Sequence, residues 1–273
     1  MKLLFTIFLI CCITLVSFGQ KDSTLKVTFL KIIATEVRDF TTDNLGNIYV
    51  LTATNQIKKV NEKGDSLAVY NNVKRYGKIF SIDAGNPLKV LVYFKDFSTI
   101  VVLDRLLNVR NTIDLRKLNI LQVRAITSSY DNNIWLYDEM DSKIKKIDDN
   151  ARVLLESNDF RQVFETVPSP VEMYDRDGQL YLYDPKKGLL VFDYYGAQKN
   201  NFPLNQLMDL QVIDKNTITA RDSSRIILFK PASLQLLSFN AFKDQRLFSK
   251  IRFNGNRLFS LTKGGELAVY VTQ

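Results

Sequence analysis

The stretch Tyr130–Asp148, YDNNIWLYDEMDSKIKKID, contains a tight turn, an apolar strand, a second turn and a second strand. Asp131, Asn132 and Asn133 are residues that tolerate the positive φ angles of short hairpins. The apolar segment Ile134–Leu136 combines β-branched and aromatic residues, which favour strands. The stretch therefore predicts an antiparallel pair of strands, and close variants of it recur along the chain.

The apolar strand after each tight turn appears six times. Its copies are Ile48–Val50, Val90–Val92, Ile134–Leu136, Leu180–Leu182, Ile218–Ala220 and Leu258–Ser260. Their first residues are spaced 42, 44, 46, 38 and 40 positions apart. A period of this length is typical of the four-stranded blades of β-propellers.

A second register repeats in step with the first. Its copies are Ile57–Asn61, Ile100–Asp104, Ile144–Asp148, Leu189–Asp193, Ile226–Lys230 and Leu267–Val271. Two registers that drift together over six copies predict an all-β chain folded as a six-bladed propeller.

The sixth repeat ends one strand short. Three strands are expected near Phe248–Phe253, Arg257–Leu261 and Glu266–Val271, after which the chain stops. The segment Thr24–Ile33, TLKVTFLKII, is strand-like and precedes the first complete repeat. We expect this N-terminal strand to complete the last blade and close the ring, so that residues 20–273 form a single domain.

The repeat resembles six-bladed propellers of the NHL or TolB-like type. A blade is marked by D-x-x-G-x followed by three apolar residues, as in Asp43–Val50, and by a later apolar strand ending in Asp or Asn. The resemblance covers residues 24–273 and implies the architecture. Propellers of this shape serve as lactonases, lyases, sugar-binding modules, sensors and scaffolds, so the resemblance does not choose an activity.

The first nineteen residues have the pattern of a secretory signal peptide. Lys2 precedes the apolar run Leu3–Val16, and Ser17-Phe18-Gly19 places small residues before a cleavage site at Gln20. The ending Ser-Phe-Gly-Gln resembles exported proteins of Bacteroidota. We expect an exported protein, periplasmic or associated with the outer membrane, with no transmembrane segment after cleavage.

Cysteine and histidine usage excludes several classes of chemistry. Cys11 and Cys12 both lie in the predicted signal peptide, and the chain has no histidine. The mature chain would therefore have no disulfide, thiol nucleophile, imidazole base or zinc-thiolate site. We interpret Asp175–Gly178 as a hairpin turn rather than a calcium loop, and predict no metal, no cofactor and no catalytic residue.

The predicted inner strands carry mixed side chains rather than repeated carboxylates. These are Thr42, Ser81, Thr127, Glu172, Gln211 and Arg252. The net charge of +8 is spread along the chain without a basic block, which disfavours nucleic acid as a partner. We expect an envelope protein as partner, with an anionic ligand or glycan as the alternative, and a monomer in isolation.

Loops between blades and between second and third strands should emerge on one side of the ring. The candidate binding residues there, together with the single tryptophan, are Arg75, Tyr76, Arg116, Lys117, Trp135, Tyr137, Asp138, Tyr183, Lys186, Arg221 and Arg246. Tyr137 and Tyr183 occupy equivalent strand ends and are predicted to be an exposed pair. Trp135 and the acidic loop Asp138–Asp141 distinguish the third repeat from the others.

These observations favour a non-catalytic interaction module or scaffold in the cell envelope. Its most specific form is an accessory part of a secretion machine of the type IX kind. Two alternatives stay open. One is a propeller hydrolase, lactonase or lyase that uses carboxylates, and the other is a glycan-binding or sensor module.

Overall fold

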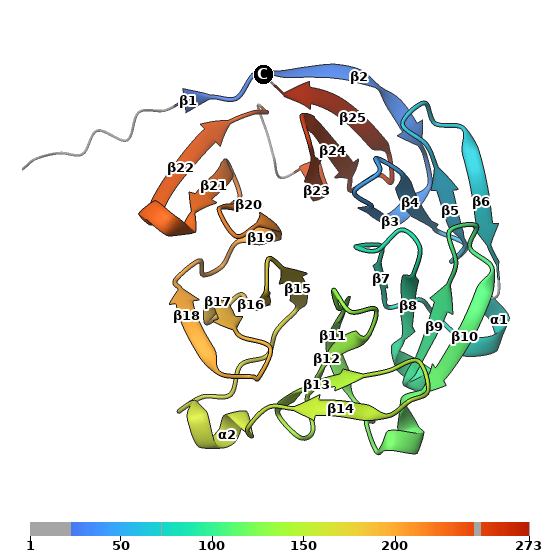
Figure 1. Ribbon diagram of the computed structural model, residues 1–273. Helices are drawn as coiled ribbons and strands as arrows, with labels where there is room; N and C mark the ends of the chain where they lie inside the picture. The colour runs from blue at the N-terminus through green and yellow to red at the C-terminus, as the bar shows by residue number, and fades with distance from the viewer. Residues whose placement is uncertain (1–22, 72, 243–246, 273) are drawn as a thin grey trace, which may run out of the picture.

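The computed structural model describes residues 23–71, 73–242 and 247–272. The predicted signal peptide, residues 1–19, and Arg246 lie outside these residues. The described chain forms six antiparallel sheets arranged in a ring, as predicted (Figure 1). Within the described residues, no helix is long and apolar enough to cross a membrane.

Each blade is an up-and-down sheet whose first strand lies nearest the ring centre. Blades one to three consist of β3 (Val37–Thr42), β4 (Ile48–Thr52), β5 (Ile57–Val60) and β6 (Ser66–Tyr70); β7 (Ser81–Asp83), β8 (Val90–Phe94), β9 (Thr99–Leu103) and β10 (Val109–Asp114); and β11 (Val123–Ser128), β12 (Ile134–Asp138), β13 (Lys143–Ile147) and β14 (Val153–Glu156).

Blades four to six repeat the arrangement. They consist of β15 (Glu172–Arg176), β16 (Gln179–Asp184), β17 (Gly188–Phe192) and β18 (Gln198–Phe202); β19 (Met208–Asp214), β20 (Thr217–Arg221), β21 (Ile226–Lys230) and β22 (Gln235–Asn240); and β23 (Phe248–Asn254), β24 (Arg257–Thr262) and β25 (Leu267–Thr272) with β2 (Val27–Ala34). The connections contain α1 (Val73–Tyr76), α2 (Phe160–Val163) and 3-10 turns at Lys95–Phe97, Leu115–Leu118 and Pro231–Ser233.

The middle strands are buried on both faces, which explains their unbroken apolar runs. Every residue of β8 and β9 is buried. The core is a set of apolar clusters between adjacent blades rather than one central core. In one of them, Trp135 and Tyr137 of blade three pack with Leu180 and Leu182 of blade four. Burial of these interfaces supplies the main driving force for assembling the ring.

The N-terminal strand closes the ring, as the sequence predicted. β2 pairs antiparallel with β25, with Lys31 opposite Val269, and becomes the outer strand of blade six. A further contact was not predicted. β1 (Ser23–Thr24) pairs in parallel with β22, so that the sheet of blade five has five strands. The N-terminal segment therefore joins blades five and six along the top of Figure 1.

The closing strand offers a test in two adjacent residues. Ile33 packs against the apolar cluster between blades six and one, whereas Ile32 is 47% exposed. We expect Ile33→Asp to lower the free energy of unfolding by about 1–3 kcal/mol because it buries a carboxylate. Ile32→Asp should change it by less than about 0.5 kcal/mol. Urea unfolding measures both, and equal effects would contradict the proposed closure.

Candidate functional site

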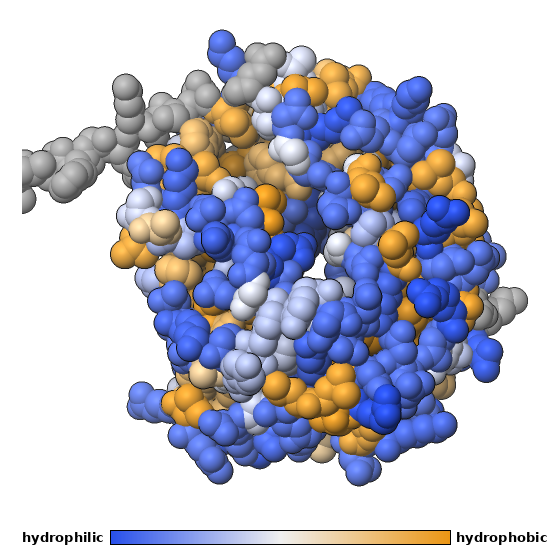
Figure 2. Space-filling view, in the orientation of Figure 1, coloured by the Kyte–Doolittle hydropathy of each residue, from blue (hydrophilic) through white to orange (hydrophobic). Residues whose placement is uncertain are grey.

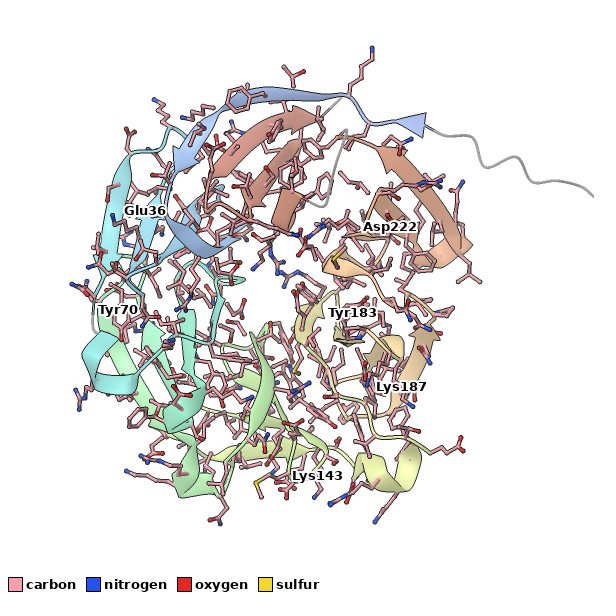
Figure 3. The ribbon with its side chains drawn as sticks, turned by 180° about the vertical axis from the view of Figure 1, so that it is seen from behind. Glu36, Tyr70, Lys143, Tyr183, Lys187 and Asp222 are labelled. Atoms are coloured by element: carbon pink, nitrogen blue, oxygen red, sulfur yellow. The ribbon has the colours of Figure 1, made fainter. Side chains whose placement is uncertain are left out.

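A cavity of about 290 Å³ lies at the centre of the ring and is lined by the inner strands of all six blades. Figure 2 shows this opening surrounded mainly by hydrophilic residues, and Figure 3, which views the ring from behind, shows nitrogen-bearing side chains near its centre. The charged lining residues are Asp39, Asp83, Arg124, Glu172, Arg176, Lys250 and Arg252. Among the predicted inner-strand residues, Thr42, Ser81, Glu172, Gln211 and Arg252 line the cavity.

One ion pair in the cavity joins blades four and six, and a hydrogen bond of the adjacent Tyr174 reaches blade five. Arg252 on β23 lies 3.1 Å from Glu172 on β15, and its guanidinium also donates to the Tyr174 hydroxyl at 3.3 Å. Tyr174 in turn donates to Glu172 and to the Leu210 carbonyl. Burial raises the pKa of the Tyr174 phenol above its ordinary value. Glu172 therefore connects blade four to blade six past the inner strand of blade five.

The two other carboxylates in the cavity also join blades. Asp39 on β3 lies 2.6 Å from Lys250 on β23 and ties the first blade to the last. Asp83 on β7 accepts from the Ser128 amide at 2.5 Å and from the Thr127 hydroxyl at 3.3 Å, both on β11. Each of the three cavity carboxylates thus binds a residue of another blade. Within the described residues, no group of three or more Asp, Glu, His or Cys side chains could hold a metal ion.

Arg124 differs from the other cations of the cavity. The hydrogen bonds of the described residues include none from its guanidinium, and its one ion pair is a 3.6 Å contact between Nε and Glu139. Its side chain is 32% exposed. The repeat pattern did not indicate Arg124, which lies three positions before Thr127, the predicted inner-strand residue of its blade.

A second polar cluster, outside the cavity, organises the interface between blades three and four. Asp175 on β15 accepts from Trp135 Nε1 at 3.0 Å, from the Tyr194 hydroxyl at 2.5 Å and from the Ser129 hydroxyl at 3.1 Å. The Nζ atom of Lys146 lies 4.8 Å from the centre of the Trp135 ring. Trp135 is 1% exposed, so in this structure it is a packing residue.

The prediction that Tyr137 and Tyr183 form an exposed pair is wrong. They are 1% and 2% exposed. Their hydroxyls donate to the Pro168 carbonyl at 2.8 Å and the Leu207 carbonyl at 2.6 Å. Burial raises the pKa of each phenol to about 12. The connections that enter the following blades cover both strand ends, which a local sequence pattern does not reveal.

Asp138 and Arg221 are buried as well, rather than displayed on loops. Asp138 lies 2.8 Å from Lys145, which also pairs with Asp141. Two of the three carboxylates of the acidic loop therefore share one lysine of the same blade, and the third, Glu139, lies 3.6 Å from Arg124. Arg221 lies 2.5 Å from Asp209, a carboxyl whose pKa is raised by burial.

The remaining candidates are surface residues of separate connections. Arg75, Arg116, Lys117 and Lys186 are exposed, and Arg116 pairs with Asp114 at 2.8 Å. Tyr76 is half-buried, with its ring 5.3 Å from that of Phe94. The eleven predicted residues therefore do not form one compact site in the described chain, and Arg246 lies outside it.

No protein-family model and no curated protein matches the chain. Solved structures share its fold. A catalytically inactive virginiamycin B lyase from Staphylococcus aureus, bound to quinupristin, has a TM-score of 0.63 at 11% identity, over 91% of this chain and 99% of the lyase. The Cps50 (Swd1) propeller domain of Myceliophteria thermophila has 0.60 at 7%, over 91% and 100%.

A third structure is the extracellular domain of a one-component system protein from B. thetaiotaomicron. It has a TM-score of 0.56 at 14% identity, over 85% of this chain and 32% of the other. At these identities the three similarities establish the propeller fold and nothing about activity. The fold thus occurs in an enzyme and in an extracellular domain alike.

The Asp175 cluster yields a prediction with a built-in reporter, since Trp135 is the single tryptophan. Asp175→Ala leaves four donors without this acceptor, since the Tyr130 amide also donates to it, so we expect the free energy of unfolding to fall by about 2–4 kcal/mol. The tryptophan emission of the folded protein should also shift. Glu165→Ala, at an exposed position, is the control and should change neither signal. Unchanged stability and emission in the Asp175 variant would show that the cluster is not a blade-joining contact.

Proposed function

We propose that this chain is an exported, non-catalytic propeller that binds an envelope protein through the outer surface of blades six and one. The observation that carries the proposal is an apolar surface, here called the 6–1 rim. Its half-exposed apolar side chains are Phe29, Leu30 and Ile32 on β2 and Leu67 and Val69 on β6. Figure 2 has apolar residues on the circumference over these parts of the ring.

The two strands of the 6–1 rim belong to different blades but lie close together. A Cβ atom built on Gly64, in the turn before β6, would lie 4.0 Å from Lys31 Nζ on β2. Arg257 of blade six pairs with Glu62 of the same turn at 2.7 Å. These contacts show that the turn before β6 adjoins β2 at Lys31, whereas Phe29 packs on Tyr270 on the side of blade five. We propose that the exposed apolar residues of the two strands act together as one interaction site, because exposed apolar surface is typical of such sites.

The chemistry of the 6–1 rim favours an extended, apolar partner segment flanked by acidic residues. β2 and β6 are the outermost strands of their sheets, and an exposed strand edge can pair with an added strand. Lys26, Lys58 and Lys63 are exposed around these strands. Their charges complement carboxylates on a partner.

The cavity supports the non-catalytic part of the proposal. A general acid or base must be free to exchange a proton with substrate. Glu172 and Asp39 are instead in ion pairs, and Asp83 accepts hydrogen bonds from the next blade. These carboxylates have structural partners whose loss would loosen the ring.

The fold similarity to the lyase suggests the rival hypothesis of an enzyme. In the solved lyase a histidine-to-alanine replacement makes the protein catalytically inactive, and this chain has no histidine. We expect quinupristin incubated with the purified protein to keep its mass and retention time. Conversion to a product of altered retention, at a rate proportional to protein concentration, would overturn the non-catalytic proposal.

Site-specific photocrosslinking tests the partner surface. A photoreactive amino acid placed at Phe29 or Leu67 should give the same adduct in cells that produce the protein. Leu106, which is 54% exposed on blade two, is the matched control and should not give it. A purified apolar peptide with acidic flanks should compete with adduct formation, and the same peptide with lysine flanks should compete poorly.

Two outcomes would contradict the proposal. Equal adducts from positions 29, 67 and 106 would indicate nonspecific contact, and no adduct from either rim position would indicate that the 6–1 rim is not an interface. The double variant Ile32→Asp, Leu67→Asp provides a second measurement. It should keep the urea midpoint of the parent, because both side chains are half-exposed, while the adduct at position 29 is lost.

A further inference from the structure

The central cavity contains more hydrogen-bond donors than its own acceptors use. Its four cations are Arg124, Arg176, Lys250 and Arg252, and its three anions are Asp39, Asp83 and Glu172. The sum is 4 − 3 = +1. All three carboxylates already accept hydrogen bonds or ion pairs within the ring. A ligand that fits this lining must therefore supply acceptors, and a negative charge on it would compete with Glu139 for Arg124.

Unused arginine donors lie on blades three and four, and the buried Arg252 Nε of blade six also has no hydrogen-bond partner among the described residues. Arg124 on β11 makes no hydrogen bond with the described residues and only the long contact with Glu139. Arg176 on β15 makes one hydrogen bond, to the carbonyl of Asp175 at 2.8 Å. An arginine has five N–H donors in a planar fork that suits a carboxylate. Most of this capacity is unused in both residues.

Apolar side chains lie on either side of Arg124 along the cavity wall. Phe80 precedes the inner strand of blade two, and Val171 precedes that of blade four, so the two flank blade three. Both line the cavity, and each is 47% exposed. The Phe80 ring is fixed by an edge contact of 5.8 Å with Tyr93. The cavity wall formed by these three blades is therefore apolar at Phe80, cationic at Arg124 and apolar again at Val171.

We propose that this wall binds a small organic monocarboxylate with an apolar tail, a site beyond the protein-binding function proposed above. The carboxylate pairs with Arg124, and the tail packs against Phe80 and Val171. The cavity volume of about 290 Å³ suits a ligand of this size. Lys250 and Arg252, which face the same cavity, are already paired with carboxylates and provide a positive background field.

Titration calorimetry of the purified protein with acetate, butanoate and hexanoate tests the site. Affinity should rise about two- to fourfold for each added methylene, because the tail buries apolar surface. Hexanamide, which has the same tail but no charge, should bind at least tenfold more weakly than hexanoate. No detectable hexanoate binding, or equal binding of the acid and the amide, would overturn the proposal.

Four variants locate the site. Arg124→Met should weaken hexanoate binding at least tenfold, Arg124→Lys should weaken it less, and Phe80→Ser should remove the dependence on tail length. Arg116→Met changes an arginine that is 55% exposed outside the cavity and should leave binding unchanged. Circular dichroism and the urea midpoint establish that each variant is folded. Hexanoate binding that survives Arg124→Met in folded protein would show that the carboxylate does not bind there.

Discussion

The structure depends on tying its first blade to its last. A propeller whose ends are not joined would expose the apolar faces of blades one and six, which each interface in the ring buries. Here the two ends are joined three times. β2 pairs with β25, Asp39 binds Lys250 on the neighbouring inner strand, and Ile33 packs into the apolar cluster between the two blades. Backbone, charge and apolar contacts all act at the same junction.

Carboxylates inside the ring connect one blade to another, whereas two arginines that line one side of the cavity have N–H donors that lack acceptors. Asp83, Asp175 and Glu172 each bind atoms of another blade. Arg124 and Arg176 instead retain donors on one side of the cavity. The proposed ligand site at this wall and the proposed protein-binding 6–1 rim consist of different residues, so a substitution in one would leave the other unchanged.

The fold could be predicted from the sequence because short segments, the turns and the apolar runs, define each repeat. Turn residues such as Asn132 and apolar runs such as Ile134–Leu136 report strands and hairpins directly. Even ring closure followed from counting strands in the sixth repeat. The pairing of β1 with blade five could not be predicted in this way, since a two-residue strand has no periodicity.

The candidate site was predicted less well because burial of a strand end is decided by a distant segment. Tyr137 is covered by the chain near Pro168, and Tyr183 by the chain near Leu207. Asp175 has the local sequence of a turn, yet it binds Trp135, forty positions earlier. The composition of the inner strands was predicted correctly as mixed, but Arg124, whose one ion pair among the described residues is with Glu139 at 3.6 Å, stands out among them only when hydrogen bonds can be counted.

The pairing of β2 with β25 has a consequence for the order in which the chain can fold. Val27 lies opposite Thr272, so the closing ladder joins residues that are far apart in the sequence. Joining ends this far apart costs on the order of 5 kcal/mol in chain entropy, unless blades formed earlier shorten the distance. Such non-local pairing is slow. A chain emerging N-terminus first therefore has no partner for the β2–β25 ladder until β25 has been made, so closure of the ring follows synthesis of the blades between the two strands.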